Sequence, residues 1–237
     1  MSTITEDYYL CEGIYLKAIE KKLIDENNND KPLVIANIDD KITIFEREVQ
    51  GWILHPMCIL LEEDIKKVEN ESSKTIFHYK YKPFKNAIAI LFNIFTYIEK
   101  MQRYYDGKPF IDGDKESTKL LLKGLKRISS LNLSSKNKSD LKDILKKTRH
   151  SMMHYGMIGD GVLLNYLHED FDEAIKYDST TKNIKISPYH LYDSISKDFE
   201  KYIKLLKNPK DPNEITRLNN FKIVFEKIYE EEINHLA

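Results

Sequence analysis

Cysteine is scarce in this sequence of 237 residues, which contains only Cys11 and Cys58. The two thiols lie far apart and neither belongs to a CxxC pair, which excludes a cysteine-rich zinc site and a scaffold held by several disulfides. Sparse, isolated cysteines are typical of proteins from a reducing compartment. We therefore expect a cytoplasmic protein.

Long apolar runs are also absent. The longest, AIAILFNIF at residues 87–95, is far shorter than the roughly 20 residues that cross a bilayer. The opening residues, MSTITEDYYL, lack both the basic and the apolar part of a secretory leader. We expect no association with a membrane.

Net charge is nearly absent, because the formal total is -1, so overall basicity does not argue for nucleic-acid binding. The distribution of charge is more informative: residues 115–149 contain eleven Lys or Arg and three Asp or Glu. Such a segment attracts a phosphate backbone, and its residues Lys142, Lys146 and Lys147 are predicted to contact RNA. A solvated helix face is the alternative interpretation of the same charge run.

Apolar residues at helical spacing dominate the chain and predict an all-α fold. We expect a single helical domain over residues 1–237, with N-terminal helices at 1–80, a bundle core at 81–207 and a C-terminal helix at 208–237. A small β-hairpin is expected between Ala174 and Ile186. The helices are predicted at 5–24, 39–69 with a kink or division at Pro56, 83–105, 120–131, 139–155, 188–205 and 215–236. The buried stripe predicted for 83–105 comprises Ile88, Leu91, Phe92, Phe95, Ile98 and Met101.

The stretch KKTRHSMMHYGMIGDG, residues 146–161, carries the side chains with the most specific chemistry. Its helix is predicted from apolar positions spaced three and four apart, namely Leu141, Ile144, Leu145, Thr148 and Met152. Gly156 is suited to end that helix, which places Arg149, His150 and His154 on its last turns. Arg149 and His154 are about 140° apart on an ideal helix. Their head groups meet only if the arginine stem bends over, or if a symmetry mate supplies one of the pair.

An arginine, a polar residue, a short interval and a histidine near a helix end resemble the motif of the HEPN superfamily, which is Arg, four to six residues, then His. The matching residues are Arg149, His150 in the polar position, and His154. The downstream EAIKYDSTTKNIKISPYHLYDSISKDFEKYIKLL resembles the hairpin and helix that many members carry after the motif. IEKMQRYYDG, with Glu99, resembles their upstream helix with an acidic residue.

The resemblance implies a HEPN-like helical bundle for residues 81–207 and a metal-independent endoribonuclease activity. It implies RNA as the substrate, a toxin or abortive-infection (antiphage) role, and a homodimer in which two copies of the motif face each other. An antitoxin or defence-system partner is also implied. We expect no metal and no cofactor.

Cleavage of a phosphodiester by its own 2′-hydroxyl requires a base, an acid and a cation for the charge that grows on the phosphate. Histidine titrates near neutral pH, and the planar arginine fork grips phosphate oxygens. The resemblance thus implies Arg149 as phosphate clamp and His154 as general acid or base, with His150 tuning or positioning them. Glu99 is a candidate to hold the Arg149 guanidinium in place.

Each of these residues also has a structural interpretation. A basic side chain near a helix C-terminus is stabilised by the dipole and free carbonyls, for about 0.3 to 1 kcal/mol, which suits Arg149 and His154. His150 could bond the backbone, and Glu99 could be an ordinary paired charge. His150 and His154 have the i,i+4 spacing of a metal site but lack the glutamate of HExxH.

Three functional hypotheses remain open on the sequence alone. The first is the endoribonuclease. The second is a non-catalytic HEPN-like module that binds nucleotide, RNA or a partner protein through the same cleft. The third is an interaction protein that uses its acidic C-terminal helix.

Overall fold

The chain forms two compact units, each built from separate stretches of sequence. The computed structural model describes residues 8–17, 20, 22–71, 86–110, 116–129, 138–152, 158–164 and 173–236. Unit 1 comprises Met1–His55, Met101–Asp114 and Phe199–Ala237, and unit 2 comprises Pro56–Lys100 and Lys115–Asp198. No helix within these described residues combines the length and apolarity needed to cross a membrane.

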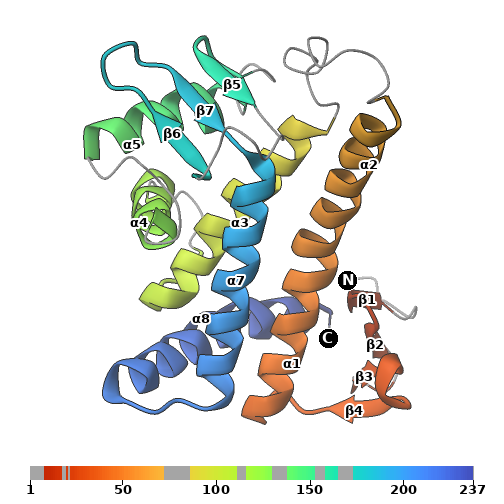
Figure 1. Cartoon of the computed structure of the whole chain (residues 1–237). Helices are drawn as coiled ribbons and strands as arrows, with labels where there is room; N and C mark the ends of the chain where they lie inside the picture. Colours follow the sequence, from red (N-terminus) through yellow and green to blue (C-terminus); the bar gives the residue numbers. More distant parts are fainter. Residues whose placement is uncertain are drawn as a thin grey trace. The chain divides into compact units, whose positions relative to one another are not determined.

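Helices dominate, but two sheets make the fold mixed (Figure 1). The α-helices are α1 (Ile38–Val49), α2 (His55–Glu71), α3 (Ala87–Asp106), α4 (Ser117–Ser129), α5 (Lys138–Leu145), α7 (Pro188–Lys207) and α8 (Pro212–Leu236). The shorter turns are η1 (Glu26–Asn28), η2 (Gln50–Leu54) and η4 (Lys146–His150). The strands are β1 (Tyr8–Cys11), β2 (Ile14–Lys17), β3 (Lys22–Asp25), β4 (Lys31–Leu33), β5 (Val162–Leu164), β6 (Ile175–Tyr177) and β7 (Ile184–Ile186). The prediction of an all-α fold with one hairpin is therefore wrong.

The largest error concerns residues 5–24, predicted as a helix. Where the structure describes them, they form strands β1 and β2 and the start of β3, with turn residues between. Gly13 has a φ of 73°, a left-handed conformation that turns β1 back onto β2. Burial then alternates along β2, where Ile14 and Leu16 are buried and Tyr15 and Lys17 are half-buried. The apolar spacing that suggested a helix therefore arose from two short strands joined at a glycine turn.

In unit 1, strands β1 to β4 form an antiparallel sheet in sequence order. The helical part of unit 1 has an aromatic core centred on the fully buried Phe45 of α1. The Phe45 ring lies 4.4 Å from the ring of Tyr104 and 5.3 Å from that of Phe221, measured between centroids. Contacts of this kind between large rings contribute beyond simple burial and join α1 to α8.

Helix boundaries in the rest of the chain follow the sequence signals closely. Gly107, with a φ of 65°, ends α3, and the Lys108 N–H bonds back to the Arg103 carbonyl at 3.0 Å. Pro188 opens α7, as predicted. The predicted 39–69 run is divided by the π-helical turn η2, which immediately precedes the helix that contains Pro56.

In unit 2, α3 is the most apolar helix and buries only part of its apolar surface. Leu91, Phe95 and Ile98 are at most 3% exposed, as the predicted stripe requires. Ile88 and Phe92 were assigned to the same stripe but are 42% and 46% exposed. Because α3 has more apolar residues than one buried face can hold, the pattern could not separate the inner ones from the outer ones.

The second sheet, in unit 2, has the order β5-β7-β6. The antiparallel pair β6 and β7 confirms the hairpin predicted between Ala174 and Ile186. Strand β5, which pairs with β7 in parallel, was not anticipated. The inward-facing residues Ile175, Ile184 and Ile186 are fully buried.

Candidate active site

The helix that carries the motif begins as α5 and buries the stripe expected of it. All five predicted positions are at most 6% exposed: Leu141, Ile144, Leu145, Thr148 and Met152. The buried Thr148 hydroxyl donates to the Ile144 carbonyl at 2.6 Å, which satisfies its polar atom inside the core. Arg149 follows directly after Thr148, so its backbone lies at the border of the buried face and its side chain is 21% exposed.

A π-helical turn, η4, replaces the regular α-helix at Lys146–His150. It carries Arg149 and His150, and π turns of this kind are frequent at functional sites. The 140° separation of Arg149 and His154 was calculated for an ideal α-helix, so that calculation does not hold for a helix with this turn. His154 itself lies outside the residues that the structure describes.

Backbone groups of η4 have partners from the loop and the next turn. The Gly159 N–H donates to the Lys147 carbonyl at 2.8 Å, and the Ser151 hydroxyl donates to the Lys146 carbonyl at 3.1 Å. These bonds satisfy carbonyls that a widened turn would otherwise leave exposed. Gly159, one of the glycines that follow the motif, thereby fixes the shape of the turn that presents Arg149.

Gly159→Ala is expected to destabilise the protein by about 1 to 3 kcal/mol, the usual cost of overpacking. A Cβ at this position would lie 2.9 Å from the Lys147 carbonyl oxygen and 3.0 Å from the Ser151 hydroxyl. The loop would have to move away from η4, which breaks the Gly159 to Lys147 bond. The free energy of unfolding, measured in urea, tests this expectation. Asp160→Ala, at the exposed neighbouring position, is the control and should change it by no more than about 0.5 kcal/mol.

The Arg149 guanidinium is held by a short network from α3 and α4. Its Nη2 donates to the Ser117 hydroxyl at 3.0 Å, and that hydroxyl donates to a Glu99 carboxylate oxygen at 2.7 Å. Arg149 Nη2 also forms an ion pair with Glu99 at 3.7 Å. A serine hydroxyl has one donor and two acceptor positions, so Ser117 can serve both neighbours at once. The structure thus places Glu99 beside Arg149, with Ser117 as the hydrogen-bonding bridge.

Ser117 was missed by the sequence analysis. A serine at the start of a helix is typical of capping, and nothing in the sequence around it indicates that it meets a residue 32 positions later. Only the packing of α4 against α5 and of Ser117 against Glu99 brings the three side chains together.

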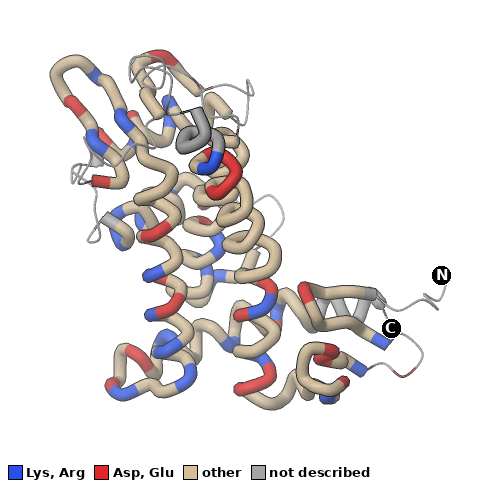
Figure 2. The backbone as a smooth tube through the Cα atoms, turned by 45° about the vertical axis from the view of Figure 1, so that its right-hand side comes forward, with Lys and Arg blue, Asp and Glu red and all other residues tan. Residues whose placement is uncertain are grey.

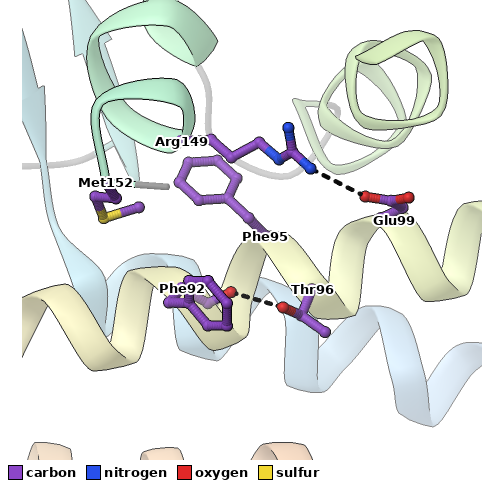
Figure 3. A pocket seen from close by; sticks show the side chains of 6 residues that line it. All are labelled: Phe92, Phe95, Thr96, Glu99, Arg149 and Met152. Carbon is purple, nitrogen blue, oxygen red and sulfur yellow. Dashed lines mark hydrogen bonds and ion pairs between the residues drawn. The ribbon is translucent and has the colours of Figure 1, made fainter. Parts of the chain in front are cut away.

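A small pocket opens beside this network (Figure 3). Its lining residues are Phe92, Phe95, Thr96, Glu99, Arg149 and Met152. The Arg149 side chain passes from the end of the motif helix over the Phe95 ring toward Glu99 on α3. The pocket therefore combines a fixed cation and a carboxylate with apolar and aromatic walls.

The other predicted site residues are distributed along the motif helix. His150 is half-buried in η4, whereas Lys142 and Lys146 are exposed. Lys147 is committed to the hairpin, because its ammonium donates to the Lys182 carbonyl at 2.5 Å. The structure therefore leaves Lys142 and Lys146 on the surface and ties Lys147 to the second sheet.

A second contact attaches the hairpin to the motif helix, this time to its α5 part. The Tyr177 hydroxyl donates to the Asp143 carboxylate at 2.7 Å. This hydrogen bond is the main reason why the pKa of Asp143 lies below its usual range, with Lys182 nearby contributing in the same direction. Strand β6 and the turn before β7 are thus attached to the motif helix close to η4.

Acidic and basic positions are interspersed along the backbone (Figure 2). In unit 2 the exposed Lys119, Lys123 and Lys126 of α4 add to Lys142 and Lys146 of the motif helix. Among the described residues, no group of three or more His, Cys, Asp or Glu side chains is arranged to hold a metal ion.

No family model, curated protein or solved structure matches this chain.

Proposed function

We propose that this chain is a metal-independent endoribonuclease of HEPN type, which cleaves RNA by acid–base catalysis. The observation that carries the proposal is the Arg149 guanidinium, held by Ser117 and Glu99 at the wall of a solvent-open pocket. A cation fixed in this way is suited to a phosphate group, because its position does not have to be established during the reaction.

In the proposed reaction the 2′-hydroxyl of the RNA attacks the adjacent phosphorus. A base removes the 2′-hydroxyl proton, the 2′-oxygen to phosphorus bond forms, and the bond to the 5′-oxygen breaks as an acid protonates that oxygen. The products are a 2′,3′-cyclic phosphate and a 5′-hydroxyl. His154 acts as the general acid or base, and His150 positions or tunes it.

Arg149 stabilises the charge that develops on the non-bridging phosphate oxygens. Glu99 and Ser117 keep the guanidinium oriented, which reduces the cost of reorganisation in the transition state. Arg149 and His154 are five residues apart in one segment, and the proposal includes a homodimer in which each chain contributes to the pair.

The test is incubation of purified protein with total RNA in the presence of a chelator, wild type beside His154→Ala. Wild type is expected to cleave the RNA, and His154→Ala to lower the rate by about 10²- to 10⁴-fold, the usual contribution of general acid–base catalysis. Far-ultraviolet circular dichroism should show the same helix content in both. Wild-type protein that leaves RNA intact, or cleavage that persists in His154→Ala, contradicts the proposal.

A toxin or antiphage effector is the biological role included in this proposal, with RNA as target and an antitoxin or defence-system partner that controls it. Expression of the wild type is expected to slow growth of a bacterial host, and expression of His154→Ala to leave it unchanged.

One observation favours a second candidate, a non-catalytic module that binds nucleotide, RNA or a partner protein. The Glu99 carboxylate already faces Arg149 at 3.7 Å, and it offsets part of the positive charge that a phosphate would meet. Binding of RNA without cleavage by the wild type would support this candidate.

A further inference from the structure

Helix α3 exposes an apolar ridge next to Arg149. Residues 86–98 contain no charged side chain, and Ile88, Phe92 and Thr96 are exposed at successive intervals of four, so they follow one another along one face of the helix. Phe92 is 46% exposed. With Ile88, which is 42% exposed, Phe92 forms an apolar patch beside the charged pocket, and exposed apolar patches mark interaction surfaces.

Phe92 lines the same pocket as Arg149 (Figure 3). The neighbouring Phe95 is only 3% exposed and belongs to the wall of the pocket, so Phe92 provides its accessible aromatic surface. A ligand in this pocket would therefore meet a guanidinium on one side and the face or edge of an aromatic ring on the other.

An unpaired nucleotide has the matching chemistry. Its phosphate suits the guanidinium, and its flat base stacks on an aromatic ring whatever the base is. A base inside a duplex is covered above and below by its neighbours and cannot stack in this way. The alternative partner for an exposed apolar ridge is a second protein surface, and a purely apolar one would leave the cation unused.

We propose that Phe92 is the stacking platform for an unpaired base adjacent to the phosphate that Arg149 holds. This rests on the proposed function, because it takes the ligand to be RNA. It adds a substrate requirement, since the site would accept a nucleotide only where the base is unpaired.

The kinetic test compares three variants on a single-stranded RNA oligonucleotide. Phe92→Ala should raise KM by roughly 5- to 150-fold with kcat changed much less, the loss that corresponds to one base–aromatic stack. Phe92→Trp keeps an aromatic face and should stay near the wild-type KM. Ile88→Ala removes an exposed apolar side chain of the same ridge that does not line the pocket, and it should leave KM unchanged.

A binding test separates this inference from the proposed function. A 2′-O-methyl oligonucleotide has no attacking hydroxyl, so its affinity, measured by fluorescence anisotropy, is independent of catalysis. Wild type should bind the single strand at least fivefold more tightly than the matched duplex, and Phe92→Ala should lose that preference while Ile88→Ala retains it.

The outcomes distinguish the two proposals. If wild type cleaves RNA but Phe92→Ala has the wild-type KM and affinity, the stacking role is wrong and the nuclease stands. If wild type cleaves nothing, yet Phe92→Ala loses the preference for the single strand, the stacking role stands and the nuclease is wrong. If Phe92→Ala changes only the sedimentation of the protein, the ridge is an interface between copies and the stacking role is wrong.

Discussion

Replacement of Arg149 by alanine is expected to lower kcat for RNA cleavage by about 10²- to 10³-fold, the loss typical of removing one group that stabilises the transition-state charge. The guanidinium is the cation in the pocket lining, and its partners hold it where a phosphate oxygen can reach it. KM should change less than kcat, because the developing charge is larger in the transition state than in the bound RNA. Single-turnover cleavage of a labelled oligonucleotide in chelator measures the effect.

The Arg149→Lys variant tests whether the planar, bidentate geometry of the guanidinium matters in addition to its charge. Arg149→Lys retains a positive charge but cannot bind a phosphate bidentately and also reach Ser117. It should therefore recover less than a tenth of wild-type kcat. An Arg149→Lys protein as active as wild type would show that a point charge is sufficient. It would contradict the proposal that Arg149 binds the phosphate bidentately.

Ser117 offers a matched control for the same network. Ser117→Ala removes the acceptor for Arg149 and the donor to Glu99, whereas Ser117→Thr keeps a hydroxyl. If the hydroxyl positions the guanidinium, alanine should lower kcat by at least about tenfold, since small misplacements are costly in catalysis, and threonine should restore most of it. Equal losses in both variants would indicate a packing effect instead.

The motif helix could be predicted because its signals are local. Apolar spacing identified Thr148 and Met152 as buried, and this placed Arg149 at the border of the core. The widened turn η4 left no trace in that spacing, because it depends on the Gly159 N–H from a loop that returns to the Lys147 carbonyl. A hydrogen bond from a loop outside the helix does not alter the local pattern of apolar residues within it.

The errors at the N-terminus and on α3 have different causes. At the N-terminus, Ile14 and Leu16 are two residues apart, which is the spacing of one face of a strand, and the left-handed Gly13 turns β1 back onto β2. On α3, Phe92 and Phe95 have similar apolarity but opposite burial. Which of them faces solvent depends on the helices packed around α3, which no spacing within α3 describes.

Removal of the Asp198 carboxylate is expected to give the largest loss of stability in unit 2. Asp198 on α7 is 6% exposed, accepts a hydrogen bond from the Tyr97 hydroxyl at 2.8 Å and forms an ion pair with Arg127 of α4. It therefore links three helices, and two of them, α3 and α4, also carry Glu99 and Ser117. Removing the Asp198 carboxylate leaves the Arg127 guanidinium, whose side chain is 18% exposed, without its counter-charge, which costs up to about 3 kcal/mol.

Two Asp198 variants separate the charge from the hydrogen bond. Asp198→Ala loses both interactions, while Asp198→Asn keeps an acceptor for Tyr97 and should be more stable than Asp198→Ala by about 1 kcal/mol. The double variant Arg127→Met with Asp198→Leu removes both charges, so its loss should be smaller than the sum of the two single losses. Urea unfolding followed by circular dichroism gives these differences. If Asp198→Ala lowers the free energy of unfolding by less than about 0.5 kcal/mol, the carboxylate does not hold α3, α4 and α7 together, and the frame that positions Arg149 must depend on apolar packing alone.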